Sequence, residues 1–169
     1  MDELYLAVMR RLANLDGISM IDEDHGQLET YEDGYPLTYP AILIGTPEIY
    51  YDDATRNYQS GTVTLQVSLV IDCYHDTHYG SSQEDFVKTH MQRFREVQET
   101  LHGFAPNLSH EEGEEVRSEC GRLCRQSARV YSLAGGVNVY ETIFQCKVKD
   151  FIRSDYDGSM SVGMRSDKG

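Results

Sequence analysis

The residues best suited to chemistry in this sequence follow its longest apolar run. Cys73, His75 and His78 form a Cys-x-His-x2-His pattern, and thiolate sulfur and imidazole nitrogen are ligands that zinc prefers. A tetrahedral zinc site needs a further ligand that this spacing does not supply. We therefore expect Cys73 to be a small core residue and both histidines to lie in a surface loop. A small metal-dependent hydrolase that uses these three residues is the alternative.

The remaining candidates for chemistry favour a protein without catalysis. Cys120 and Cys124 lack the spacing of a zinc knuckle, and neither a G-x-S-x-G nucleophile motif nor a P-loop occurs. The first residues do not resemble a signal peptide, so the four cysteines are expected to be reduced thiols. We predict no enzymatic activity and no cofactor.

Carboxylates dominate the charge. The formal net charge is −13, from 15 Lys and Arg against 28 Asp and Glu. Such a chain repels nucleic-acid phosphates, which argues against a specific nucleic-acid binder and leaves an acidic adaptor or nucleic-acid-mimicking inhibitor as a further alternative. No apolar run is long enough to span a membrane. We expect two acidic loops to face solvent or a channel through Asp22, Glu23, Asp24, Glu111, Glu112, Glu114 and Glu115.

The element that would position these residues is a long strand over 58–74. Branched apolar side chains occupy every second position and polar side chains lie between them, which indicates a strand with one buried and one wet face. Helical periodicity predicts amphipathic helices over 2–15 and 82–102, the second opened by a capping box at 82–85. Further strands are expected at 18–21, 41–51, 123–133 and 137–151.

This order of elements predicts an α+β fold. Consecutive strands pair, so we expect an antiparallel sheet with two amphipathic helices packed on one face, a two-layer sandwich. Residues 41–74 would form a long protruding β-hairpin. Residues 22–40 and 105–119 would be surface loops. Residues 1–153 would form a single α+β domain, and 154–169, rich in Gly and Ser, a flexible C-terminal arm.

Half of the tyrosines fall in one loop and one hairpin tip. Tyrosine buries a large area with few rotatable bonds and keeps a polar end, which suits protein–protein interfaces. We expect these six to contact neighbouring subunits: Tyr31, Tyr35, Tyr39, Tyr50, Tyr51 and Tyr58.

Four segments carry a resemblance to a known family. The N-terminal helix leads to YPAILIG, then VTLQVSLVIDCY, the helix DFVKTHMQRFREVQETL and the closing strand YETIFQCKVKDF. In element order and apolar pattern, residues 3–152 resemble the tail-terminator (tail-completion) and neck-ring proteins of tailed bacteriophages. The segments 22–40, 105–119 and the C-terminal arm depart from that pattern.

The resemblance implies a structural protein of the virion tail or neck, assembled in the bacterial host cytoplasm. Such a protein forms a homo-oligomeric ring, a hexamer or dodecamer, which caps the tail tube and docks the head connector on the portal side. DNA would pass through the ring transiently and without sequence preference. A wall of negative charge suits that passage, because attraction would make the DNA stick.

Overall fold

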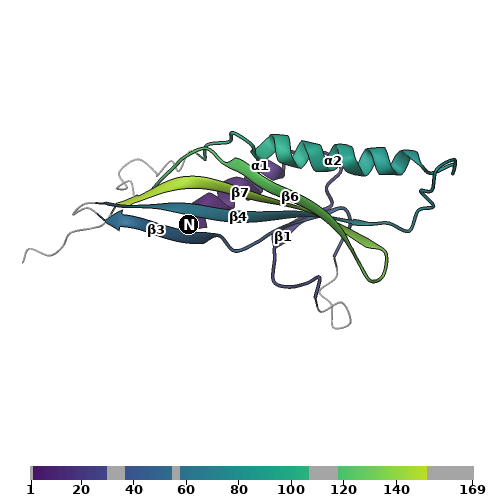
Figure 1. Cartoon of the computed structure of the whole chain (residues 1–169), viewed down its shortest axis with the longest axis horizontal. Coiled ribbons are helices and arrows are strands. Elements are labelled where there is room, and N and C mark those ends of the chain that lie inside the picture. Colours follow the sequence, from purple (N-terminus) through teal and green to yellow (C-terminus); the bar gives the residue numbers. More distant parts are fainter. Residues whose placement is uncertain (1, 30–36, 55–57, 107–117, 152–169) are drawn as a thin grey trace, which may run out of the picture.

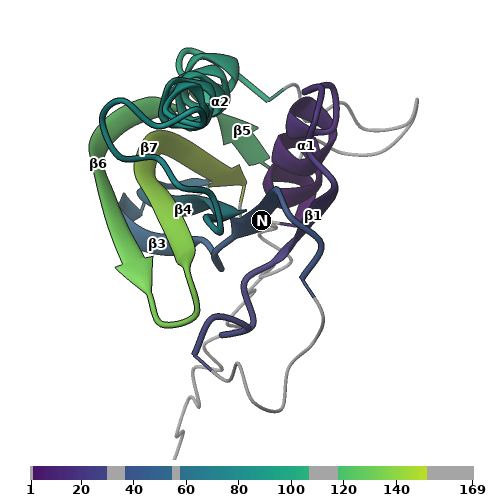
Figure 2. The ribbon, with the colours of Figure 1, turned by 90° about the vertical axis from the view of Figure 1, so that its right-hand side faces the viewer.

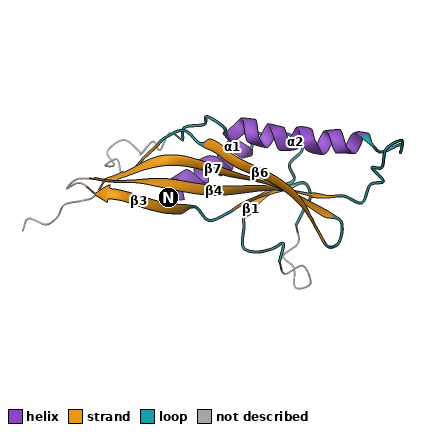
Figure 3. Ribbon diagram, in the orientation of Figure 1, coloured by secondary structure: helices purple, strands orange, loops and turns teal. Residues whose placement is uncertain are grey.

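The computed structural model describes residues 2–29, 37–54, 58–106 and 118–151 (Figure 1). Two helices lie against one seven-stranded sheet, so the predicted α+β class is confirmed (Figure 3). In chain order the elements are α1 (Asp2–Leu12), β1 (Met20–Glu23), β2 (Ala41–Ile44), β3 (Glu48–Ala54), β4 (Tyr58–Asp72), α2 (Asp85–Leu101), β5 (Ser118–Cys120), β6 (Cys124–Leu133) and β7 (Val137–Phe151).

The sheet is built on two long central strands. β4 and β7 pair antiparallel over their whole length, from Tyr58 opposite Phe151 to Asp72 opposite Val137. Along one half of this pair, β2 and β1 flank β4 while β6 flanks β7; along the other half, β3 flanks β4 and β5 flanks β7. Viewed along the strands, β6 lies at one margin and β1 at the other (Figure 2).

The alternation of β4 divides the sheet into two faces. The apolar set of β4 lies under the helices with Phe144 of β7 and Leu4, Val8 and Leu12 of α1, and all are buried. We call this the helix-covered face and its opposite the open face. On the open face a smaller cluster around Val70 and Val139 is covered at one end by Leu28, Leu37 and Tyr39.

Three expectations need correction. β1 runs parallel to β2, so the sheet is mixed rather than purely antiparallel. The segment 22–40 is not simply a surface loop, because it starts inside β1 and places the buried side chain of Gln27, whose amide bonds the Glu23 carbonyl at 2.7 Å. Helix α2 starts at Asp85 after Glu84, which makes no side-chain cap, so the predicted capping box does not form.

Candidate interaction surfaces

The distal end of the sheet, where β3 ends and β4 begins, carries three of the predicted interface tyrosines. Tyr50 is 67% exposed and Tyr51 47% exposed, while Tyr58 is half-buried. The ladder places Tyr50 and Tyr58 on the open face and Tyr51 on the opposite side. The three tyrosines therefore share one end of the molecule but not one face.

The Tyr51 side chain crosses β4 at a glycine, Gly61, and is held by a residue of β7. Its hydroxyl donates to the Asp150 carboxylate at 2.7 Å, and this bond raises the pKa of Tyr51 above its usual value. Gly61 lies opposite Tyr51 in the ladder, and a Cβ there would sit 3.2 Å from the ring and 3.0 Å from the Tyr50 carbonyl oxygen. Glycine is thus the residue that lets the ring pass over β4 to reach β7.

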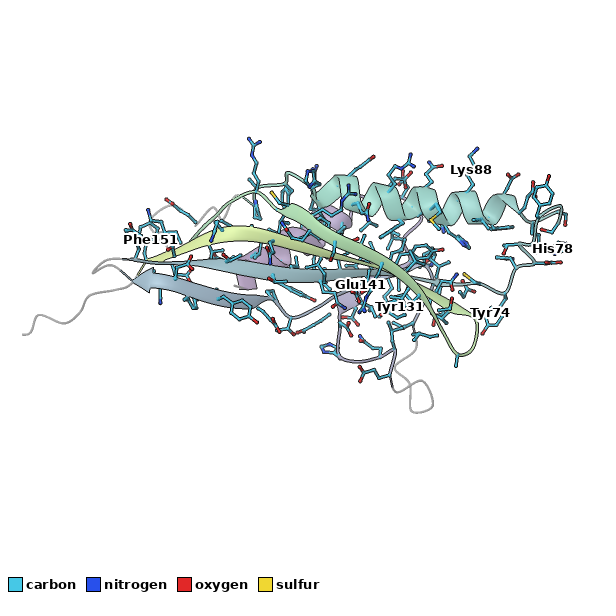
Figure 4. All side chains as sticks on the ribbon, viewed as in Figure 1. Tyr74, His78, Lys88, Tyr131, Glu141 and Phe151 are labelled. Carbon is cyan, nitrogen blue, oxygen red and sulfur yellow. The ribbon has the colours of Figure 1, made fainter. Side chains whose placement is uncertain are left out.

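Lysines accompany the aromatic rings on the open face of the distal end. The Lys149 ammonium lies 4.2 Å from the centre of the Tyr58 ring and 5.8 Å from that of Phe151, within cation–π range. The Lys147 ammonium donates to the Thr62 hydroxyl at 2.7 Å and lies 3.5 Å from the Asp52 carboxylate. Figure 4 shows Phe151 at this end of the molecule and His78 at the other.

The tip therefore consists of three strands rather than two. Because β7 accompanies β4 as far as Tyr58, the β3–β4 hairpin extends outward with β7 beside it. Tyr39 is half-buried and packs on the open-face apolar cluster, away from the distal end. Tyr31 and Tyr35 lie outside the described residues.

An ion pair between a buried glutamate and an exposed arginine lies in the middle of the open face, and the sequence analysis missed it. Glu141 is 4% exposed and accepts two bonds from Arg129, at 2.7 Å from Nε and 2.9 Å from Nη2 (Figure 4). The Arg129 guanidinium also lies 5.1 Å from the Tyr131 ring centre. A carboxylate in an otherwise apolar strand stretch, VYETIF, was the available signal, since a buried charge needs a partner.

The remaining open face is polar. Gln145 donates to the Thr64 hydroxyl at 3.1 Å, and Gln66 reaches the Ser68 hydroxyl at 3.5 Å. Alternate residues of β4 thus offer hydroxyl and amide groups where a buried face would need aliphatic ones.

The acidic candidates divide between strand and undescribed loop. Asp22 and Glu23 lie in β1 and Asp24 directly follows it, whereas Glu111, Glu112, Glu114 and Glu115 lie outside the described residues. Burial and the charges of the three acids near β1 raise the pKa of Tyr5, on α1, to about 12. The acids lie at the margin of the sheet formed by β1, which runs beside α1 (Figure 2).

In the structure, Cys73, His75 and His78 do not converge on a common metal site. The His75 ring stacks on Phe86 with centroids 4.0 Å apart, and His78 Nδ1 contacts an Asp76 carboxylate oxygen at 2.5 Å. Cys73 Sγ instead lies 4.0 Å from Nδ1 of His90, a buried residue of α2 whose pKa is lowered, chiefly by burial and then by Arg93. Within the described ranges, no group of three His, Cys, Asp or Glu side chains could hold a metal ion.

One further cysteine pair escaped the sequence analysis. The Sγ atoms of Cys120 and Cys146 lie 3.2 Å apart across β5 and β7, and both thiols are free. Their hydrogen bond lowers the pKa of Cys120 and raises that of Cys146. Only the pairing of these strands brings the two together, so the earlier comparison of Cys120 with Cys124 could not find it.

Comparison with known proteins identifies a likeness of fold. No family model matches the sequence, and no curated protein matches it. Among helices in the described ranges, none is long and apolar enough to cross a membrane. Among solved structures, a chain of "Virion of native gene transfer agent (GTA) particle" matches with a TM-score of 0.60 at 12% identity, over 86% of this chain and 94% of that chain. At this identity the likeness establishes a shared fold.

Proposed function

We propose that this chain is a structural subunit of a phage-like particle that assembles into a ring at the tail or neck. One observation carries the proposal: a virion chain shares the fold over nearly the whole length of both molecules. The resemblance of residues 3–152 to tail-terminator and neck-ring proteins rests on the sequence pattern and leads in the same direction.

The surfaces of the molecule suit a subunit of an assembly. Tyr50, Tyr51 and Phe151 at the distal end are exposed in the single chain, and Tyr is enriched where proteins bury surface against one another. In the proposed ring, Tyr50, Tyr51 and Tyr58 contact the adjacent subunit, and Tyr39 lies near a neighbour or the next ring. The ring caps the tail tube on one side and meets the head connector on the other.

Charge suits the proposed channel. With a net charge of −13 on each subunit, a ring of copies surrounds its centre with a negative field. DNA passes such a wall without adhering. The acids near β1 and those of 111–115 are the residues we assign to the wall or to the solvent-facing rim.

The test is the mass and shape of the assembled protein. Purified protein should give the mass of a closed ring by light scattering and native mass spectrometry, and annular particles by negative-stain electron microscopy. The same chain should co-purify with particles from the producing cells and lie at one position on the tail or neck by labelling. A chain that is absent from particles and forms no ring would contradict the proposal.

A further inference from the structure

Charge is segregated along the sequence. Between Arg11 and Arg56 there is no Lys or Arg, while that stretch carries ten Asp and Glu. From Cys120 to Tyr140 the relation reverses, with three Arg and no Asp or Glu. In a chain with this excess of acid, an acid-free stretch of that length requires an explanation.

In the fold, the acid-rich stretch and the acid-free stretch lie at opposite margins of the sheet. One continuous row across the ladder runs from Asp22 through Leu43, Ser68 and Glu141 to Arg129. We call the side of β6, with Arg122, Arg125 and Arg129, the basic margin. We call the side of β1, with Asp22, Glu23 and Asp24, the acidic margin; Glu48, at the start of β3, lines the same hollow as Asp24. Figure 2 shows β6 and β1 on opposite sides of the central strands.

The basic margin is open to a partner. Arg122 is exposed; Arg125 is exposed although its guanidinium donates to the Gln98 side chain of α2, and the side chain of Arg129 is 68% exposed although it binds Glu141. Its strand, β6, pairs only with β7 among the described elements, so its outer edge carries backbone groups that a further strand could bind. His102 accepts the Arg125 backbone N–H at 3.2 Å, which limits the available edge to the part of β6 beyond that residue.

The acidic margin contains a hollow that could receive an arginine. It lies between the end of β1 and the start of β3, and two of its lining residues are Asp24 and Glu48. Thr64, Gln66 and Ile143 of the open face also line it. Two carboxylates over polar and apolar side chains offer acceptors for the guanidinium and a surface for the arginine stem.

We propose that the basic margin of one copy binds the acidic margin of a second copy, with β6 arginines entering the hollow beside Asp24 and Glu48. This inference rests on the proposed function, names the surfaces that join its subunits, and places the acids near β1 in that contact instead of on the channel wall or rim. The partner is a second copy because the same chain carries both halves of the charge complement. Two different patches on opposite sides of one subunit give head-to-tail contacts, which can close into a ring.

Strand direction agrees with this contact. β6 is antiparallel to β7, β7 to β4, and β4 to β3, so β6 and β3 run in opposite directions. β1 is parallel to β2, which is antiparallel to β4, so β1 also runs opposite to β6, and a neighbour in the same orientation brings its β6 antiparallel to β1. At β1 the backbone of Glu23 is already bound, its N–H by the Asp22 carboxylate at 2.9 Å and its C=O by Gln27, so side chains carry the contact there.

Charge reversal on each margin tests the proposal by sedimentation velocity and light scattering of the full chain. Arg122→Glu with Arg125→Glu should weaken association at least about tenfold, because like charges would then face each other. Asp24→Lys with Glu48→Lys, which reverses both carboxylates of the hollow, should do the same. Lys88→Glu with Arg95→Glu on exposed positions of α2 matches the first charge change and should leave association unchanged.

The decisive variant carries both reversed margins in one chain. At the hollow, two lysines then face two glutamates, so association should return to within a few-fold of the unaltered protein. Circular dichroism and thermal melting verify that each variant is folded. An unaltered protein that stays monomeric, margin variants that behave like the α2 control, or a combined variant without recovery would each overturn the proposal.

The outcomes also separate this proposal from the proposed function. A ring that forms normally in the margin variants contradicts the assigned contact and leaves the ring function standing. Association that follows the charge reversals but yields open chains, in a protein absent from particles, supports the contact and contradicts the ring function.

Discussion

The two faces of one sheet differ in what their side chains contact. On the helix-covered face, Leu65 and Phe144 lie opposite each other in the ladder, and both are fully buried. One residue along each strand, Gln66 and Ile143 line a hollow on the open face. The same pair of strands therefore supplies a dry core on one side and a surface for partners on the other, and the variants below test that division.

The largest expected effect on stability comes from removing the phenyl ring of Phe144, at the centre of the helix-covered face. Phe144→Ala should lower the free energy of unfolding by about 3–5 kcal/mol, because the buried cavity cannot fully collapse. Ile143→Ala, the adjacent residue on the open face, should cost only about 1 kcal/mol. Urea denaturation followed by circular dichroism measures both. Equal losses would show that the open face is as tightly packed as the covered one.

A glycine variant tests the distal end, where Tyr51 crosses β4. Relief of glycine's conformational entropy would add about 0.5–1 kcal/mol of stability for Gly61→Ala. A Cβ 3.0 Å from a backbone oxygen adds overpacking of about 1–3 kcal/mol, so the net effect should be a loss. Displacing Tyr51 from Asp150 should also return its pKa toward 10.0, measurable by ultraviolet titration. A stabilised variant with the tyrosine pKa unchanged would contradict the crossing.

A smaller effect should appear with pH at the end of the helix-covered face. Burial lowers the pKa of His90 below 6.5, so the unfolded chain binds the proton more readily than the folded one. Stability contributed by the neutral imidazole is present above pH 6.5 and is lost as pH falls below it. His90→Gln should flatten the pH dependence of the urea midpoint between about pH 7.5 and pH 5, the range in which the imidazole of the unfolded chain takes up its proton. An unchanged slope would assign the effect to other groups.

The smallest effect on folding should come from the exposed tyrosines. Tyr50→Ala with Tyr51→Ala should leave the monomer folded and cost it about 1 kcal/mol, since Tyr50 is largely exposed and Tyr51 loses one hydrogen bond, to Asp150. The same change should weaken assembly of the oligomer, because in the proposed ring of subunits both tyrosine side chains are buried against the adjacent subunit. Light scattering measures the assembly. A full ring from the double variant would exclude the distal tyrosines from the interface.

Local patterns predicted the elements that carry strong periodicity. The alternation in 58–74 identified β4 and its two faces, and the glycine-rich turn at 134–136 correctly divided β6 from β7. The helix over 82–102 was found to within a few residues, but its capping box was wrong, because the helix starts at Asp85 and the residue before it, Glu84, makes no side-chain cap. Interface roles for the tyrosines remain predictions.

By itself, the sequence determined the α+β class, the two-faced central strand and the excess of negative charge, because a period of two and a charge count are local properties. Only the tertiary structure decided the parallel pairing of β1, the Tyr51–Asp150 bond across Gly61 and the Arg129–Glu141 pair. It also decided that acid-rich and acid-free stretches lie on opposite margins. The physical reason is strand register: β4 and β7 meet across some 80 residues of chain, and no periodicity within either strand fixes which of its residues face the other.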